Sequence, residues 1–143
     1  MRGVLRLWAR AQAQASPDPL VANEQFGVGG LDTVRGYEES EVLGDSGALL
    51  QTELRSPSLA DTIGVPAVNE LRFHAFGDTS YAAINGPLPE QKRSYSLNSV
   101  GAGVRVRVFD HYNGQVEGAT ALSNGPVTRS GSNRVLFRLF GDF

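Results

Sequence analysis

A strict alternation of two residue classes runs through the first segment of the chain. From Gly3 to Ala15 the odd positions are all glycine, alanine or leucine, whereas the even positions carry arginine and glutamine, interrupted only by Val4 and Trp8. Successive side chains of a β-strand point to opposite faces, so this period separates an apolar face from a polar one, whereas a helix would mix them. The segment therefore predicts a long amphipathic strand.

The same period returns five more times along the chain, and turn-forming residues separate the repeats. A strand that crosses a bilayer needs only about 9–11 residues, half of which can be polar. Six strands joined in chain order predict an all-β antiparallel meander, and an open section of a barrel, because a closed bacterial barrel needs at least about eight strands. The further expected strands span residues 48–55, 69–81, 95–109, 114–122 and 133–143.

The connections between the expected strands differ in length, which predicts an orientation in a membrane. Outer-membrane barrels have short turns on the periplasmic side and longer loops outside. The short turn at 110–113 is therefore expected at the periplasmic end, together with the connection at 56–67. By parity, the loops 16–46, 81–94 and 123–132 are expected outside.

The composition excludes several classes of function. The 143 residues contain no cysteine, so disulfide frameworks, cysteine-ligated zinc and thiol nucleophiles are ruled out. Two histidines leave little for a metal cluster, and His74 is expected as a polar residue on the same strand face as Asp78. A net charge of −2 gives no signal for nucleic-acid binding, and no nucleophile motif is present. We therefore expect no enzyme, no cofactor and no metal.

The sequence predicts neither a transmembrane helix nor a signal peptide in this chain. It has no run of about 18 apolar residues, so no transmembrane helix is expected. Arg2, Arg6 and Arg10 interrupt the apolar stretch of about 7–15 residues that a signal peptide needs. For a protein of the outer membrane, the export signal is then expected upstream of this chain or lost, and the chain is expected to be a truncated product or a fragment.

The longest connection, residues 16–46, holds the most specific motif of the sequence. It reads Phe-Gly-Val-Gly-Gly-Leu-Asp-Thr-Val-Arg-Gly-Tyr over residues 26–37, and a Gly-Asp pair follows at 44–45. A loop of this length without a period is uncommon in a compact domain and usually has a function. The motif and a later Phe-Gly-Asp at 76–78 resemble the outer-membrane polypeptide transporters of two-partner secretion, the haemolysin-activator and filamentous-haemagglutinin transporter family.

The resemblance covers essentially the whole chain and implies a sixteen-stranded barrel, of which residues 1–143 are the C-terminal part without a periplasmic domain. In that family the loop folds into the barrel lumen as a gate, and its arginine meets an aspartate of a Phe-x-Asp-x-Gly motif. These residues correspond to Arg35 and to Asp78, which follows Phe76, whereas Ser80 departs from the final glycine. The other gating residues implied are Gly29, Gly30, Val34, Gly36 and Tyr37.

The end of the chain resembles the barrel-assembly signal of outer-membrane proteins. Val135, Phe137 and Leu139 alternate along one strand face, and Phe143 is the last residue. The resemblance implies contact with outer-membrane lipid and recognition by the barrel-assembly machinery.

The resemblance as a whole implies a transporter in the bacterial outer membrane that secretes a large adhesin or haemolysin through its barrel. A guanidinium and a carboxylate can pair bidentately, and the pair is stronger in a narrow, partly dry lumen than at a surface, which suits Arg35 and Asp78. Two alternatives stay open. One is a barrel-assembly or surface-antigen protein, which shares the Val-Arg-Gly-Tyr tip but inserts other barrels. The other is a soluble β-sheet binding module.

Overall fold

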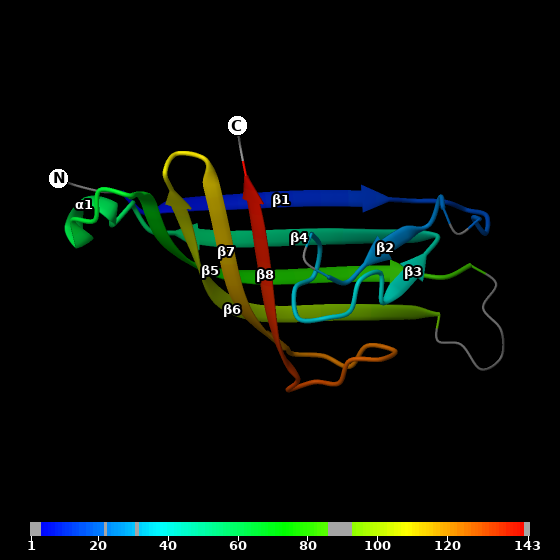
Figure 1. Ribbon diagram of the computed structural model, residues 1–143. Coiled ribbons are helices and arrows are strands. Elements are labelled where there is room, and N and C mark those ends of the chain that lie inside the picture. Colours follow the sequence, from blue (N-terminus) through cyan, green and yellow to red (C-terminus); the bar gives the residue numbers. More distant parts are fainter. Residues whose placement is uncertain (1–3, 22, 31, 86–92, 142–143) are drawn as a thin grey trace.

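The computed structural model describes residues 4–21, 23–30, 32–85 and 93–141, and six of its strands form one antiparallel sheet. These strands follow one another across the sheet in chain order, as Figure 1 shows. The predicted all-β meander is confirmed, with strand ends that differ from the expected ones by a few residues. The sheet consists of β1 (Arg6–Gln14), β4 (Ser46–Arg55), β5 (Val68–Ala83), β6 (Ser94–Val108), β7 (Tyr112–Ala121) and β8 (Asn133–Gly141).

Two connections contain regular structure that the sequence did not predict. Within the loop 16–46, β2 (Phe26–Val28) pairs with β3 (Val42–Gly44) in an antiparallel hairpin. Strands of three residues are too short to show a period of two, so the sequence pattern misses them. Between β4 and β5 a helical turn, α1 (Ala60–Ile63), ends at Gly64, whose φ of 68° is the left-handed conformation that favours glycine.

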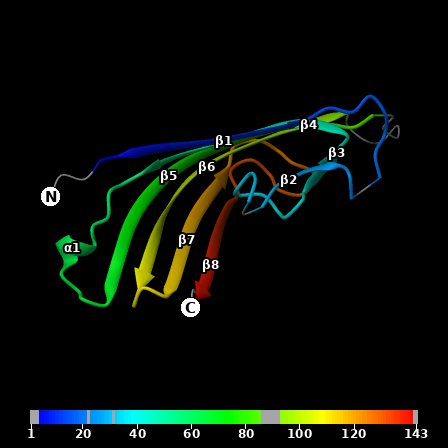
Figure 2. The same ribbon diagram turned by 90° about the horizontal axis from the view of Figure 1, so that it is seen from above.

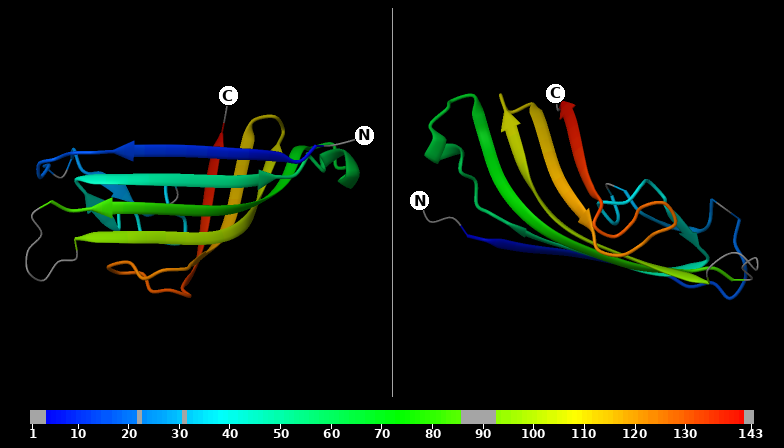
Figure 3. Two further views of the ribbon diagram at one scale, coloured as in Figure 1. Left: turned by 180° about the vertical axis from the view of Figure 1, so that it is seen from behind. Right: turned by 90° about the horizontal axis from the view of Figure 1, so that it is seen from below.

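The sheet is strongly curved, as Figures 2 and 3 show. Its convex face is apolar. Because the register aligns directly opposite residues, each strand position can be assigned to one of the two faces. No described strand position on the convex face carries aspartate, glutamate, lysine or arginine. The large side chains exposed on this face include Leu7, Leu50, Leu54, Phe73, Val100, Val116, Val135, Phe137 and Leu139.

The concave face carries the polar and charged side chains, and the loop with β2 and β3 lies against one end of it (Figure 2). An apolar cluster is buried between this loop and the strands, so the core of the molecule lies inside the curve. Burying a side chain such as valine or leucine contributes roughly 1.5–3 kcal/mol, which favours the docked position of the loop. The cluster comprises Phe26, Val28, Val34, Tyr37, Val42, Leu49, Ala82, Leu97 and Ala121.

The sheet is open, because β1 and β8 lie at opposite edges and do not pair with each other. The expectation of an open section is therefore confirmed. An unpaired edge offers a row of backbone donors and acceptors to a further strand, which suits a sheet that continues into a larger barrel. In the part of the chain that the structure describes, no helix is long and apolar enough to span a bilayer.

The expectation that the convex face meets lipid gives a first prediction, because a position that faces lipid cannot accept a charge. Val116 lies on the convex face of β7, and Asn113 lies on the concave face of the same strand. We expect Val116→Arg to lower the free energy of unfolding in bilayers by about 2–4 kcal/mol, the cost of arginine near the middle of the membrane. The measurement is urea unfolding of the full-length barrel in phospholipid vesicles, with Asn113→Arg as the control. Equal effects of the two variants would contradict the assignment of the faces.

Candidate functional site

The loop between β1 and β4 reverses its direction at a pair of glycines. Gly29 and Gly30 have φ values of 116° and 104°, which L side chains rarely adopt. A Cβ at Gly29 would collide with the carbonyl oxygen of Glu38, so the two arms of the loop can approach each other only with glycine here. The N–H of Gly29 donates to Oγ1 of Thr33 at 2.8 Å, which shapes the tip that presents Arg35.

Arg35 points from this tip to the concave face of β5 and pairs with Asp78. Its Nε lies 2.7 Å from Oδ2 and its Nη2 lies 2.9 Å from Oδ1 of the aspartate, so the pair is bidentate. The backbone N–H of Arg35 also donates to Oδ2 at 3.1 Å. The guanidinium stacks on the ring of Phe76, with 3.6 Å between its central carbon and the ring centroid. Both charged residues are buried, at 4% and 3% exposure.

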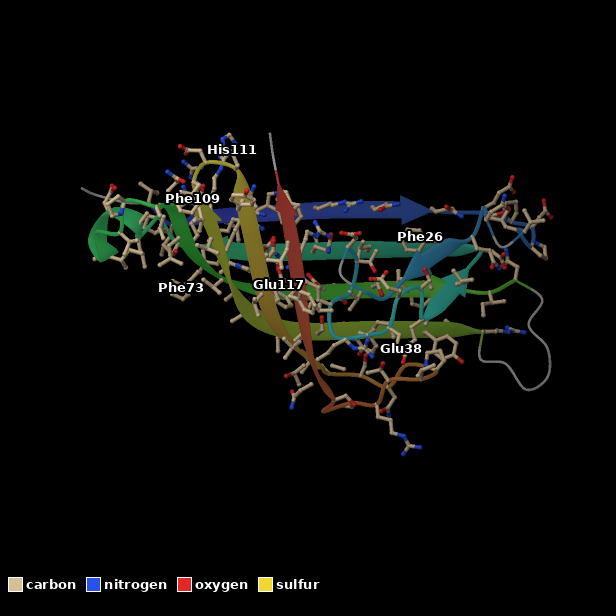
Figure 4. The ribbon with its side chains drawn as sticks, in the orientation of Figure 1. Phe26, Glu38, Phe73, Phe109, His111 and Glu117 are labelled. Atoms are coloured by element: carbon tan, nitrogen blue, oxygen red, sulfur yellow. The ribbon has the colours of Figure 1, made fainter. Side chains whose placement is uncertain are left out.

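Three further ionisable side chains surround the guanidinium, and the sequence did not single them out as site residues. Glu117, which is labelled on β7 in Figure 4, has its Oε1 3.3 Å from Nη1 of Arg35. Glu53 on β4 has its Oε1 3.6 Å from the same nitrogen. His74 on β5 lies with Nε2 3.0 Å from Oε1 of Glu117. We call Arg35, Glu53, His74, Asp78 and Glu117 together the Arg35 cluster.

The Arg35 cluster contains a set of residues that could hold a metal ion by their type. Ligand atoms of Glu53, His74 and Glu117 all lie within 4.8 Å of one another. The guanidinium of Arg35 already contacts both carboxylates, so the loop itself supplies the positive charge that these buried groups need. The carboxylates of the concave face thus form a binding site for a cation, and the guanidinium of Arg35 occupies this site.

Glycines on the neighbouring strand make room for the cluster. On β6, a Cβ at Gly101 would collide with the ring of Phe76. A Cβ at Gly103 would lie 2.8 Å from side-chain atoms of both His74 and Glu117. The glycine-rich stretch of β6 therefore gives the bulky and charged side chains of β5 and β7 a place on the concave face.

Next to Arg35, the tip is attached to β6 and to the end of β7. Gly36 has a φ of 101°, and a Cβ there would lie 3.3 Å from the Cβ of Ala119. Tyr37 is fully buried, and its hydroxyl donates to the carbonyl oxygen of Ser123 at 2.6 Å. The same hydroxyl accepts from the N–H of Asn98 at 3.3 Å. Together with the contacts of Arg35, the tip therefore contacts four strands, β4, β5, β6 and β7.

The returning arm of the loop is held separately, by Glu41. Its carboxylate accepts hydrogen bonds from the hydroxyl and the N–H of Thr128, the latter at 3.0 Å, and from the N–H of Val127 at 3.4 Å. Gly125 lies so close to this carboxylate that a Cβ would collide with it. Burial raises the pKa of Glu41, but the hydrogen bonds from Thr128 outweigh burial, so the net pKa lies below the ordinary value. We call these contacts the Glu41 clasp.

Asp45 anchors the base of the loop where the chain enters β4. Its carboxylate accepts from the N–H of Leu20 at 2.7 Å, from the N–H of Asn85 at 2.6 Å and from the side chain of Gln25 at 3.2 Å. The two backbone N–H bonds, led by that of Leu20, hold the pKa of Asp45 below its usual value. The Gly-Asp pair of the motif thus joins the loop to the connection between β5 and β6.

The residues of the expected assembly signal lie apart from this site. Val135, Phe137 and Leu139 share the convex face of β8, and each is more than two-thirds exposed, at 71%, 72% and 77%. Phe143 lies outside the described residues. The loop residues and the end of β8 therefore belong to different faces of the sheet.

A family model and a solved structure both match this chain. Residues 3–106 match the family model of the haemolysin secretion/activation protein ShlB/FhaC/HecB. Among solved structures, CdiB from Acinetobacter baumannii has a TM-score of 0.70 and 20% sequence identity, so this likeness shows the fold. The match covers 94% of this chain but only 23% of the length of that protein. No curated protein matches the chain significantly.

The Glu41 clasp is expected to open in acid. Because the folded protein lowers the pKa of Glu41, the clasp stabilises the docked loop above the ordinary pKa of glutamate and is lost as the pH falls through the lowered value. We expect Glu41→Gln to loosen the returning arm at neutral pH by about 1 kcal/mol. Spin labels on cysteines at positions 39 and 130 would report the distance between the two loops.

The matched control for this prediction is Glu24→Gln, which removes an exposed carboxylate from the same loop. The control should leave the label distance unchanged at neutral pH. A distance that stays constant in the Glu41 variant and in acid would show that the clasp does not hold the loop.

Proposed function

The chain belongs to the haemolysin secretion/activation family ShlB/FhaC/HecB, and we propose that its curved sheet lines part of the pore through which a partner polypeptide is secreted. Proteins of this family are transporters of two-partner secretion in the bacterial outer membrane. The apolar convex face fits the lipid of that membrane, and the charged concave face fits a lumen. Membrane lipid is thus the first partner that we propose.

The loop 16–46 is proposed as the gate of this pore. The observation that carries the proposal is the burial of Arg35 among carboxylates of three strands, with a bidentate pair to Asp78. A buried charge without its partners is costly, so the loop has a strongly preferred position across the concave face. A polypeptide can pass only after these contacts have been exchanged for others.

The secreted partner is proposed to be a large adhesin or haemolysin that crosses the lumen in an extended state. The match over residues 3–106 favours this reading over a barrel-assembly protein and over a soluble binding module. The uncharged convex face also argues against a soluble module, since such a wide exposed apolar surface is rare on soluble monomers.

We further propose that the end of the chain acts during assembly of the barrel. Val135, Phe137 and Leu139 are exposed on the last strand of the sheet, next to its unpaired edge. An edge strand with this pattern can be recognised by pairing with another sheet, which suits the barrel-assembly machinery as a partner.

The gate proposal predicts loss of secretion when either member of the central pair is removed. Arg35→Ala leaves buried carboxylates without their cation, and Asp78→Ala leaves a buried guanidinium without its bidentate partner, a cost of about 3–5 kcal/mol in each case. We expect the full-length variants to insert into the outer membrane but to release no partner into the medium, because neither variant can exchange the contacts of this pair for those of an open loop position. Immunoblots of the medium and of the membrane fraction measure the two outcomes.

Two further variants sharpen this test. Arg35→Lys keeps the charge but loses the bidentate geometry, so secretion should fall without disappearing. Asp61→Ala removes an exposed carboxylate from α1 and should have no effect. Normal secretion by both Arg35→Ala and Asp78→Ala would refute the proposed gate.

A further inference from the structure

Beyond the Arg35 cluster, toward the β6–β7 turn, the concave face becomes strongly basic. The register places one carboxylate there, Glu70, at the strand positions past His74 and its neighbours that the structure describes. Arginine is the dominant side chain at the same positions. We call this region the basic surface; it comprises Arg72, Arg105, Arg107 and Arg138.

The arginines of the basic surface are held by neighbours but remain accessible. Arg138 pairs with Asp32 of the loop at 2.8 Å, and its side chain is 45% exposed. Arg72 pairs with Glu70 at 2.5 Å and is 25% exposed. Arg105 donates to the neutral Oε1 of Gln115 at 3.2 Å. The carboxylates within reach are too few to balance the charge, so the region keeps a net positive potential.

The loop at the other end of the concave face has the opposite charge. Residues 15–45 contain Arg35 as their single basic residue, and its guanidinium is buried in the Arg35 cluster. Asp32 of this loop pairs with Arg138 at 2.8 Å, so the loop reaches one edge of the basic surface. Figures 2 and 3 show the loop far from α1 and the β6–β7 turn, so the rest of that surface is left uncovered. The acidic residues of the loop are Asp18, Glu24, Asp32, Glu38, Glu39, Glu41 and Asp45.

We propose that the basic surface binds acidic segments of the secreted polypeptide as they enter the pore. Arginine side chains bind carboxylates bidentately, and an extended chain can present successive carboxylates to several strands. The acidic loop at the far end repels the same segments, which disfavours a second tight binding position there and favours release. An anionic lipid is not the ligand, because the basic surface lies on the face opposite the apolar one.

This inference rests on the proposed function, since it names the chemistry that the pore selects in its substrate. The turn between β6 and β7 is short, and short turns of outer-membrane barrels lie on the periplasmic side. We therefore infer that the basic surface lies at the periplasmic end of the pore. The order of charges along the path is therefore basic at the entrance and acidic at the exit.

The test uses the full-length transporter in detergent and two fluorescent peptides of equal length, one rich in glutamate and one rich in glutamine. Fluorescence anisotropy should show binding of the glutamate peptide alone, and the binding should weaken as salt is raised. The double variant Arg72→Gln/Arg105→Gln should bind this peptide about tenfold more weakly, because two exposed ion pairs are lost.

Two controls keep the result interpretable. Arg72→Lys/Arg105→Lys preserves the charge and should keep most of the binding, and Arg129→Gln removes an exposed arginine from the β7–β8 connection and should change nothing. Heat-modifiable migration on gels shows whether each variant has folded. If the glutamine double variant fails to fold, binding of both peptides equally by the wild type would still overturn the inference.

Failure of this inference is distinguishable from failure of the proposed function. A wild-type transporter that releases its partner but binds both peptides alike, or a folded glutamine double variant that binds the glutamate peptide as the wild type does, would overturn the inference alone. A wild-type transporter that releases no partner polypeptide at all would instead overturn the proposed function.

Discussion

The buried guanidinium of Arg35 is the interaction on which the arrangement of this molecule depends. Removing such a charge from water costs several kcal/mol, and only well-placed acceptors offset that cost. Here the acceptors come from β4, β5 and β7, and the loop must reach across the concave face to bring its charge to them. The loop can approach this closely because the glycines of β6, and Gly36 at the loop tip, have no side chain in the way.

The second constraint is the separation of charge between the two faces of the sheet. Side chains alternate in direction along every strand, so a sheet whose convex face is apolar must place its polar residues inside the curve. That arrangement collects the Arg35 cluster, the basic surface and the docked loop on a single concave surface. An apolar exterior and a charged interior therefore follow from one sequence period.

Much of this structure could be predicted from the sequence, because six strands show the period directly. The resemblance of the loop motif also pointed to Arg35 and Asp78. In the structure, Nε of Arg35 lies 2.7 Å from Oδ2 of Asp78. Glu53 and Glu117 were not assigned to the site, because they lie on strands that no local pattern connects to the loop. Their contact with Arg35 depends on the register and curvature of the sheet.

The short elements were missed for a related reason. The β2–β3 hairpin has only three residues in each strand, and the Glu41 clasp joins two connections that have no period at all. Contacts of this kind are fixed by how the loops pack on the finished sheet. Sequence patterns therefore located the loop that we propose as the gate, whereas the structure was needed to show what holds this loop in place.

The most direct test of the account is to prevent the loop from leaving the concave face. Cysteines in place of Glu41 and Thr128, two residues that contact each other across the clasp, can be joined by a short cross-linker with a reducible bond. The account predicts that the linked full-length transporter stops releasing its partner and that reduction of the linker restores release. Release at the wild-type rate from the linked transporter would contradict the gate.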